Sequence, residues 1–238
     1  EQVLARDLFL VNREPARVWG AAHEFVSSPK LDDLMCAYTS LLAFLAAENP
    51  GCVTVFCCFD NEEVGSNTKQ GAMSTFLPDV LGRLTEALGL TPEDYRRALA
   101  KSMLVSCDNA HAVHPNRPEK YDAANRCLNG GIVVKEAANQ HYCTDAFSRA
   151  AFLALCERTG VPCQPFANRS DMAGGSTLGN LSNIQASMHA VDVGCPQLAM
   201  HSSYETAGTR DVRLATRALQ AFFEASMVIE GAESVRFC

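Results

Sequence analysis

The sequence predicts an α/β fold in which helices flank a central β-sheet. Short apolar runs alternate with longer amphipathic stretches along the chain, and this alternation is typical of a sheet covered by helices. The polar residues best suited to chemistry follow directly after the apolar runs, at the strand ends where open α/β sheets place their sites. The 238 residues contain no internal repeat and no Pro/Ser-rich linker, so we expect a single domain.

Four apolar runs are expected to form strands, since Val, Ile, Met and Cys dominate them and polar residues or a glycine follow. In chain order they are Cys52–Asp60, Met103–Cys107, Ile132–Glu136 and Ala186–Val193. Helices are expected where apolar side chains recur at spacings of three and four. They are Leu31–Ala47, Gly71–Leu88, Cys143–Thr159 and Asp211–Ala225, with a further helix starting at Thr91. At that start Thr91 is placed as the N-cap, Pro92 as the first helical residue and Asp94 as the partner in a capping box.

Composition excludes several classes of protein. Hydrophobic residues make up 47% of the chain and charged residues 20%, as in a globular protein rather than a disordered or fibrous one. The formal charge of −7 and the lack of a basic block disfavour nucleic acid as a partner. No apolar run approaches the roughly 18 residues that a membrane span requires, so we expect no membrane partner. The eleven cysteines are odd in number and several lie in apolar runs, which predicts reduced thiols and a cytoplasmic location.

Two predicted strands run directly into residues that can bind a metal or transfer protons. The first is followed by Glu62 and Glu63, which point in opposite directions in an extended segment. One could bind a metal while the other faces a bound water, although a solvated acidic loop explains this pair better when it is taken alone. The second strand is followed by Asp108, His111 and His114. These fit a metal or acid–base site and, equally, a turn with two surface histidines.

Two further candidates have simple structural explanations when each is taken alone. Asp32 lies in an acidic pair at a predicted helix start, where a negative charge favours the helix dipole. A single histidine after an apolar run, such as His201, is usually structural. Together, however, four residues supply the mixed carboxylate and imidazole ligands that suit zinc, manganese or cobalt: Asp32, Glu63, Asp108 and His201. Glu62 is then left as a general base, and the pattern is that of a metallohydrolase.

The segment Asp171–Gly179 is rich in glycine but matches no phosphate-binding or nucleophile motif. Gly174 and Gly175 are instead expected to let the backbone pass close to a substrate or to another strand. A two-metal enzyme of phosphoryl transfer is disfavoured, because it needs basic groups for the phosphate and Lys and Arg are only scattered here.

Six segments together form a specific pattern: SSPKLDDL, FDNEEVGSNTKQGA, CDNAHAVHPN, GGIVVK, SDMAGGSTLGN and PQLAMHSSYETAG. In this order they resemble the aspartyl aminopeptidases, cytoplasmic dinuclear zinc exopeptidases that assemble into hollow tetrahedral dodecamers. The resemblance runs from near residue 5 to near residue 225 and is strongest to the bacterial branch. It implies a zinc-exopeptidase-like three-layer sandwich around a mixed sheet, with peptides as substrates and self-assembly into a homo-oligomer. It also implies two zinc ions per full-length subunit, with Mn²⁺ or Co²⁺ as alternatives.

The resemblance implies a role for each candidate ligand. Asp32 resembles the aspartate that bridges the two metals, and Asp108 resembles the carboxylate that completes the first metal site. Glu63 and His201 resemble the ligands of the second metal. Glu62 resembles the general base that takes a proton from the attacking water.

The resemblance also implies which residues bind the substrate. Lys135 matches a lysine that lines the pocket for the N-terminal side chain, where a cation would pair with Asp or Glu, although some relatives prefer neutral side chains. His111 and His114 lie in a matched segment and are expected to support the site near the metal. The backbone around Gly174 and Gly175 is expected to line the substrate cleft.

One metal ligand of the family has no counterpart in these residues. It is a histidine in an HTD-type motif, and no HTD occurs here. His23 aligns just before the bridging aspartate and is not that residue. The dimerisation domain, which the family inserts ahead of the segment that begins at Asp7, also has no counterpart. We therefore expect residues 1–238 to be the C-terminal part of a metallo-aminopeptidase catalytic domain, without the N-terminal metal-ligand segment and the dimerisation domain.

The expected function is hydrolysis of N-terminal residues, mainly Asp or Glu, from peptides by metal-activated water with Glu62 as the base. The alternative is that this chain is an inactive assembly or metal-binding fragment, because it lacks one ligand and one domain. An upstream coding region that contains HTD would favour the enzyme, and translation that starts near Glu1 would favour the fragment.

Overall fold

The computed structural model describes residues 2–122, 126–231 and 233–238 and contains a central sheet of four strands in the order β3-β7-β5-β6. These strands are β3 (Met103–Cys107), β5 (Ile132–Glu136), β6 (Cys163–Ala167) and β7 (His189–Gly194). β7 is parallel to β3 and antiparallel to β5, and β5 is parallel to β6. The central sheet is therefore mixed, as the resemblance implies.

A second sheet of five strands adjoins the ends of β3 and β7, in the order β1-β2-β9-β8-β4. Its strands are β1 (Arg17–Trp19), β2 (Phe25–Ser28), β4 (Ala110–His111), β8 (Pro196–Leu198) and β9 (Glu205–Gly208). β4 follows β3 and β8 follows β7 almost directly along the chain, so residues at the ends of the central strands enter the second sheet. A separate hairpin pairs β10 (Met227–Ile229) with β11 (Val235–Phe237).

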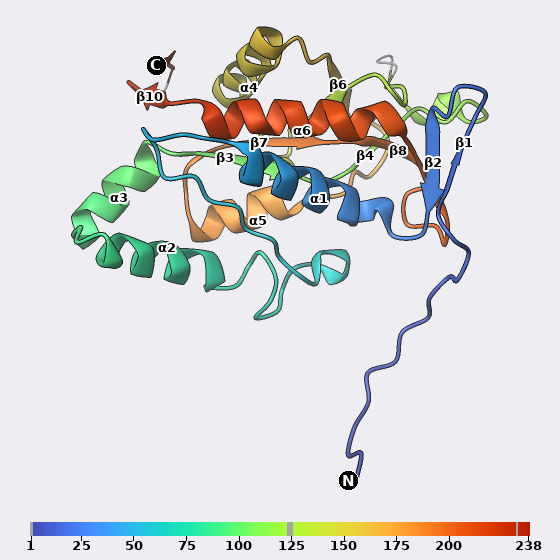
Figure 1. The fold of residues 1–238 in the computed structure, drawn as a ribbon, viewed down its shortest axis with the longest axis horizontal. Coiled ribbons are helices and arrows are strands. Elements are labelled where there is room, and N and C mark those ends of the chain that lie inside the picture. The colour runs from blue at the N-terminus through green and yellow to red at the C-terminus, as the bar shows by residue number, and fades with distance from the viewer. Residues whose placement is uncertain (1, 123–125, 232) are drawn as a thin grey trace.

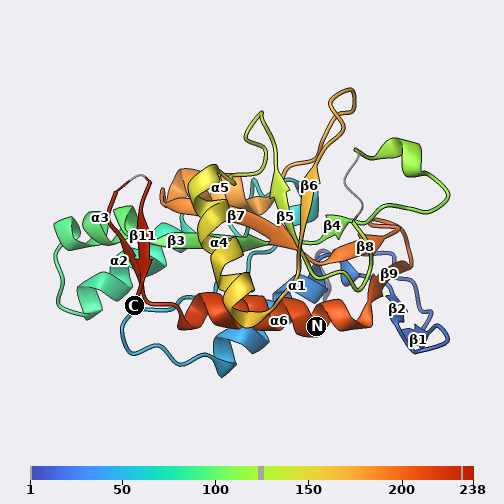
Figure 2. The same cartoon turned by 90° about the horizontal axis from the view of Figure 1, so that it is seen from above.

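Helices cover both faces of the central sheet, so the fold has three layers (Figures 1 and 2). The helices are α1 (Leu31–Ala46), α2 (Phe76–Ala87), α3 (Pro92–Ala100), α4 (Ala146–Thr159), α5 (Leu178–Gln185) and α6 (Thr209–Glu224). α1, α4 and α6 share a hydrophobic core with Val134 and Val191 of the sheet. α5 lies on the opposite face, where its Gly179 approaches Ser106 and Asp192. The predicted sandwich of a mixed sheet between helices is confirmed.

Three predicted strands are confirmed and one is wrong. β3 and β5 have the predicted bounds, and β7 begins three residues later than the predicted Ala186–Val193. Cys52–Asp60 forms no strand, because no strand of the described residues makes a hydrogen-bonded ladder with it. A strand needs a hydrogen-bonded neighbour as well as an apolar sequence, and the apolar side chains of Val53 and Val55 are exposed.

Local caps decide where two of the helices begin. α4 starts after Asp145, whose side chain accepts a hydrogen bond from the backbone N–H of Ser148 at 2.8 Å, and therefore three residues later than the predicted Cys143. At the start of α3, the Thr91 hydroxyl accepts a hydrogen bond from the Asp94 N–H at 3.2 Å. The capping box predicted there is confirmed, with Pro92 in the first turn.

Other helix bounds and several short elements differ from the prediction. α2 begins at Phe76 rather than Gly71, and α6 begins at Thr209 rather than Asp211. Periodicity in the sequence does not predict α5, β6 or the second sheet, whose strands have only two to four residues. Such short strands carry too little periodicity to be recognised. Among the described helices, none has both the length and the apolar composition to cross a membrane.

Helix α1 carries apolar side chains on two faces. On the inner face, Met35, Cys36 and Ala43 are buried in the core. The other face, the outer stripe of α1, consists of residues that are 39% to 70% exposed: Leu34, Tyr38, Leu41 and Leu45. Spacing in the sequence predicts the helix correctly but does not tell which of its two apolar faces is covered.

Gly194, the last residue of β7, allows the chain that leaves β3 to pass very close. The Asp108 N–H donates a hydrogen bond to the Val193 carbonyl at 3.0 Å. A Cβ added to Gly194 would lie 1.8 Å from the Asp108 carbonyl oxygen, which no side chain tolerates. A glycine is therefore required where the central sheet meets the segment with Asp108.

Replacing Gly194 by alanine should lower the free energy of unfolding by about 2–3 kcal/mol or more, because backbone must move to relieve the overlap. Urea denaturation monitored by circular dichroism measures the change. The matched control is Gly82→Ala in α2, where nothing lies within 4 Å of an added Cβ. That variant should gain about 0.5–1 kcal/mol from helix propensity. Equal changes in the free energy of unfolding for the two variants would contradict the close approach of Gly194 to the Asp108 backbone.

Candidate metal centre

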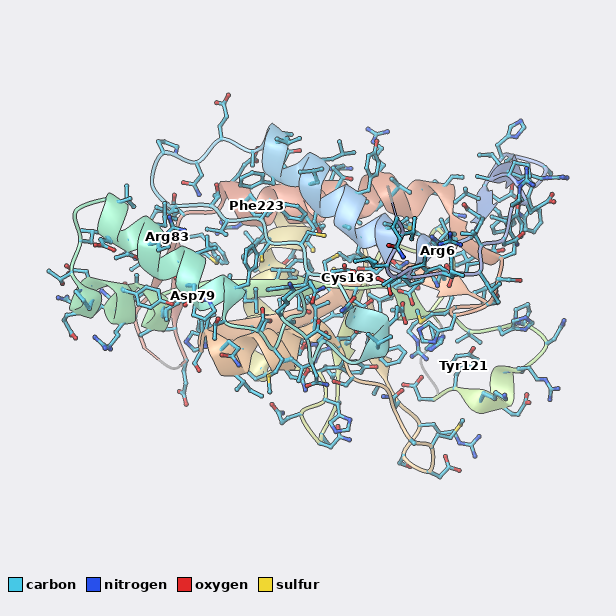
Figure 3. The ribbon with its side chains drawn as sticks, turned by 90° about the horizontal axis from the view of Figure 1, so that it is seen from below. Arg6, Asp79, Arg83, Tyr121, Cys163 and Phe223 are labelled. Carbon is cyan, nitrogen blue, oxygen red and sulfur yellow. The ribbon has the colours of Figure 1, made fainter. Side chains whose placement is uncertain are left out.

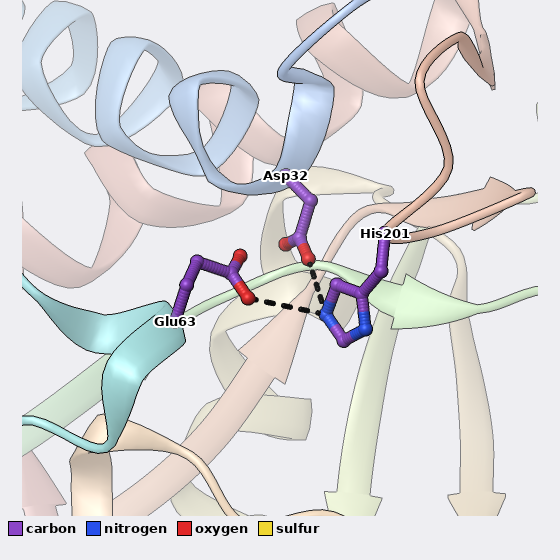
Figure 4. A group of neighbouring side chains, drawn as sticks. All are labelled: Asp32, Glu63 and His201. Atoms are coloured by element: carbon purple, nitrogen blue, oxygen red, sulfur yellow. Dashed lines mark ion pairs between the residues drawn. The ribbon is translucent and has the colours of Figure 1, made fainter. Parts of the chain in front are cut away.

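Side chains from three distant segments meet beside the end of the central sheet. Asp32 comes from the first turn of α1, Glu63 from the short helix Glu62–Val64, and His201 from the loop between β8 and β9. The Nε2 of His201 lies 3.1 Å from Oδ2 of Asp32 and 3.3 Å from Oε2 of Glu63 (Figure 4). One ligand atom from each residue lies within 4.8 Å of the other two, as around a single zinc ion.

Glu205, the first residue of β9, holds two of these segments in place. Its side chain is buried, with Oε2 accepting the N–H of Asp32 at 2.9 Å and Oε1 accepting the N–H of His201 at 2.8 Å. Both bonds reach backbone atoms, so the ligand side chains stay free to face the cavity. One buried carboxylate thus joins the start of α1 to the β8–β9 loop.

A second acidic group shares Asp32 with the first. One oxygen atom from each of Asp32, Asp33 and Asp108 lies within 4.8 Å of the others. Oδ2 of Asp32 faces His201, whereas its Oδ1 is buried with no hydrogen-bond partner among the described residues. A buried carboxylate oxygen without a partner is costly. The two oxygens of Asp32 therefore fit a carboxylate shared between two cations.

Lys135 brings a positive charge into this acidic region. Its side chain is 3% exposed, and Nζ donates a hydrogen bond to Oδ2 of Asp108 at 3.1 Å. Burial acts to lower the pKa of Lys135, but the charges of Asp108, Tyr142 and Asp192 raise it more, so its pKa lies above the usual value. Lys135 is therefore a fixed cation at the site.

Crowding and burial raise the pKa values of the carboxyl groups. Burial first, and then the charges of Asp108, Glu63 and Glu205, raise the pKa of Asp32 to about 8. Burial first, and then Asp108 and Glu63, raise the pKa of Glu62 to about 7. Without a metal the cluster therefore holds protons near neutral pH. A divalent cation neutralises the same charge and would displace those protons.

The acidic groups open onto a cavity of about 770 Å³. Its acidic wall is formed by Asp32, Glu62, Glu63 and Asp108, with His201 beside them. Other walls come from the segment 166–177 and from Tyr121, which Figure 3 labels beside the short helix Pro118–Lys120. The cavity is large enough for one end of a peptide.

The structure brings most of the residues predicted from the sequence to this cavity. Its lining contains the following of them: Asp32, Glu62, Glu63, Asp108, His111, Lys135, Gly175 and His201. Two predicted residues lie elsewhere. Gly174 is absent from the lining, and an added Cβ there would meet the Asn168 amide. His114 accepts a hydrogen bond from the Asn116 N–H in a turn and is also absent from the lining.

Sequence reasoning missed two buried residues that orient the site. Glu205 lies in the segment PQLAMHSSYETAG, but nothing in its spacing shows that it accepts two backbone N–H groups. Asn109 donates from Nδ2 to the Leu31 carbonyl at 2.9 Å and to the Gln197 side chain at 2.6 Å. It thereby fixes the start of α1 against the end of β3. A polar residue directly next to a predicted ligand is the one signal that could have identified Asn109.

The sequence of the chain is similar to known zinc aminopeptidases. A family model described as "Aminopeptidase I zinc metalloprotease (M18)" matches residues 1–223. The "Probable M18 family aminopeptidase 2" of Clostridium novyi is 44% identical over 224 residues, which cover 94% of this chain and 52% of that protein. The protein of the same name from Mycobacterium leprae is 42% identical over 226 residues, covering 94% and 53%. The chain thus spans about half the length of the curated relatives it matches.

Solved structures share the fold. A chain in the cryo-EM structure of the Ape4 and Nbr1 complex matches with a TM-score of 0.84 and 38% identity, over 90% of this chain and 42% of that chain. The S. cerevisiae mApe1 dodecamer matches with a TM-score of 0.79 and 29% identity, over 90% of this chain and 49% of that chain. These matches agree with the mixed α/β sandwich described above.

The raised pKa of Asp32 predicts how the stability of the metal-free protein depends on pH. Between its ordinary pKa of 3.8 and about 8, the folded state binds more protons than the unfolded state, so stability falls as pH rises through this range. The melting temperature in the presence of a chelator should therefore decrease from pH 5 to pH 8.

Asp32→Asn should flatten this decrease and remove zinc binding, while Glu86→Gln, which removes an exposed carboxylate from α2, should change neither. Differential scanning calorimetry and elemental analysis provide the two readouts. A melting temperature that rises with pH in the metal-free protein would contradict the crowding of carboxylates.

Proposed function

The chain belongs to the aminopeptidase I zinc metalloprotease family (M18), and from this premise we propose that the intact protein removes N-terminal residues from peptides. The observation that carries the proposal is the meeting of Asp32, Glu63 and His201 within 4.8 Å at a cavity that Glu62 also lines. Carboxylate and imidazole ligands on one wall, with a free carboxylate beside them, are what metal-assisted hydrolysis requires.

We propose that the protein holds two zinc ions per subunit, with Mn²⁺ or Co²⁺ as alternatives. Glu63 and His201 would bind one ion and Asp108 the other, and Asp32 would bind both through its two oxygens. The support is the partnerless Oδ1 of Asp32 and its place in both acidic groups. When bound, zinc supplies a Lewis acid that polarises the scissile carbonyl and eases the ionisation of water.

Glu62 is proposed as the general base. It precedes Glu63, lines the same cavity and has its pKa raised to about 7 by burial and by neighbouring carboxylates. A carboxylate of that basicity accepts a proton readily at neutral pH. Glu62 would take a proton from the attacking water and pass it to the amine that leaves as the peptide bond breaks.

Lys135 is proposed to select substrates with an N-terminal Asp or Glu. Its ammonium group is buried at the cavity wall and lies 5.5 Å from the centroid of the Tyr142 ring. A carboxylate side chain that enters the cavity would find there a cation and an aromatic wall. A neutral side chain would leave the charge of Lys135 without a new partner.

We further propose that these residues are the C-terminal part of the catalytic domain. The outer stripe of α1 is apolar and exposed. Residues 52–60 have a strand-like sequence but form no ladder with a strand of the described residues. A preceding segment of the intact protein would cover both, supply the histidine that the first metal lacks, and carry the dimerisation domain. The described part of this chain is thus proposed to be one half of the catalytic machinery.

The intact protein is also proposed to assemble with copies of itself, as a dodecamer. The support is its likeness to S. cerevisiae mApe1, whose solved structure is a dodecamer. A cytoplasmic location is proposed because the described cysteines are all free, which suits a reducing compartment.

Replacing Glu62 by glutamine in the intact protein should abolish turnover of an Asp-amide fluorogenic substrate and leave the zinc content unchanged, because only proton transfer is lost. Glu63→Gln should lower both turnover and the zinc content, because a ligand is lost. General base catalysis contributes about 10²–10⁴-fold to rate, so a loss of that size is expected for Glu62→Gln. Activity close to wild type in Glu62→Gln would refute the proposed base.

The 238-residue chain expressed alone should self-associate through the outer stripe of α1, since exposed apolar side chains on one helix face bury each other in water. Light scattering as a function of concentration measures this. Leu45→Glu should reduce association, whereas Leu90→Glu makes the same change at an exposed leucine outside the stripe and should not. A chain that stays monomeric at high concentration would argue against the proposal that another segment covers the outer stripe of α1.

A further inference from the structure

A row of four side chains crosses the central sheet beneath the cavity. The strand register pairs Ser106 with Asp192, Asp192 with Lys135, and Lys135 with Phe166. Residues paired across neighbouring strands point to the same face of a sheet. Lys135 and Phe166 line the cavity, and Asp192 therefore stands beside the cavity lysine in the same row.

Asp192 uses both carboxylate oxygens and is fully buried. Its Oδ1 accepts a hydrogen bond from the Thr177 hydroxyl at 2.7 Å. Its Oδ2 accepts from the backbone N–H of Cys143 at 2.6 Å and from the Cys143 thiol at 2.9 Å. Hydrogen bonds to a charged acceptor are stronger than neutral ones, so these contacts tie two remote segments to β7.

The two segments held by Asp192 both contribute to the lining of the cavity. Thr177 ends the glycine-rich segment and also lines the cavity. Cys143 follows Tyr142, whose ring lies 5.5 Å from the Lys135 ammonium and 5.8 Å from the Phe166 ring. The carboxylate of Asp192 therefore connects the segment of Thr177 and the segment of Tyr142 to the row of side chains that contains Lys135.

The fold makes room for this contact at Gly179, in the first turn of α5. A Cβ there would lie 2.5 Å from Oδ1 of Asp192 and 2.7 Å from the Ser106 side chain. Only a glycine lets α5 approach the sheet closely enough for Thr177 to reach the carboxylate. A side chain at position 179 would push α5 away from the sheet and break the hydrogen bond between Thr177 and Asp192.

We propose that Asp192 is a positioning residue for substrate selection, which holds Thr177 and Tyr142 around the ammonium of Lys135 so that the cavity discriminates acidic from neutral N-terminal side chains. This inference rests on the function proposed above. Asp192 does not touch the substrate, because it is fully buried. It acts through the placement of the two walls.

A purely structural role for Asp192 makes a different prediction. If its bonds only stabilised the fold, weakening them would lower stability and would reduce affinity for all ligands alike. If they shape the cavity around Lys135, the loss falls selectively on ligands with a carboxylate side chain. The ratio of two affinities therefore separates the two roles.

The test uses Thr177→Val in the intact, zinc-loaded protein, because valine keeps the shape of threonine and replaces its hydroxyl with a methyl group that cannot donate to Asp192. Isothermal titration calorimetry with L-aspartate and with L-leucine gives the two dissociation constants. We expect wild type to prefer L-aspartate and Thr177→Val to lose about tenfold of that preference, the size of one lost charge-assisted hydrogen bond. With an Asp-amide substrate the loss should appear in KM rather than in kcat.

Three further variants complete the test. Thr177→Ser restores the hydroxyl and should restore the preference. Asp192→Asn cannot accept from both Thr177 and Cys143 and should lose at least as much preference as Thr177→Val. Thr159→Val removes a hydroxyl that bonds only to carbonyls of its own helix and should leave the preference unchanged.

Each outcome of these titrations either supports or overturns the proposed role of Asp192 in ligand selection. A wild-type protein without preference for L-aspartate, or a Thr177→Val protein whose two affinities fall equally or not at all, overturns the role of Asp192. If the protein binds L-aspartate selectively and the variants behave as expected, but no peptide is hydrolysed, the proposed function fails and the role of Asp192 in ligand selection stands.

Discussion

Repulsion between carboxylates is the constraint on which the candidate site depends. Asp32, Glu63 and Asp108 face one cavity with Glu205 buried behind them, and such crowding opposes folding unless other groups compensate. Compensation comes from backbone N–H groups that donate to Glu205 and from the ammonium of Lys135 that donates to Asp108. The apolar core on the far face of the sheet provides the free energy that holds these segments together.

Much of the fold follows from local sequence. Helices α3 and α4 begin where Thr91 and Asp145 cap them, and each cap depends on residues only three positions apart. The strands at Met103–Cys107 and Ile132–Glu136 are predicted correctly because their neighbours lie in the described chain. Residues 52–60 have an equally strand-like sequence and form none. The difference lies in pairing, which no local pattern encodes.

Some residues of the candidate site can likewise be recognised from local sequence, and others cannot. The acidic and histidine residues that follow apolar strands stand out in the sequence, and matched segments give them roles. Glu205 and Asp192 do not stand out, because their importance lies in hydrogen bonds to segments 173 and 49 residues away. A buried carboxylate in a strand is visible as an anomaly only after the sheet has been assembled. Gly174 shows that the same holds for close packing, since an added Cβ there would meet the Asn168 amide, a contact that no local pattern encodes.

The separation between Asp32 and Glu205 has a consequence for the order of folding. Contacts between residues so far apart form late, because the chain between them must lose entropy before they can meet. A metal ion is therefore a poor template for the unfolded chain, in contrast to small zinc-binding modules whose ligands are neighbours in sequence. We expect metal loading to be a late event, which gives the cell a point at which cation supply decides how much of the folded protein becomes competent.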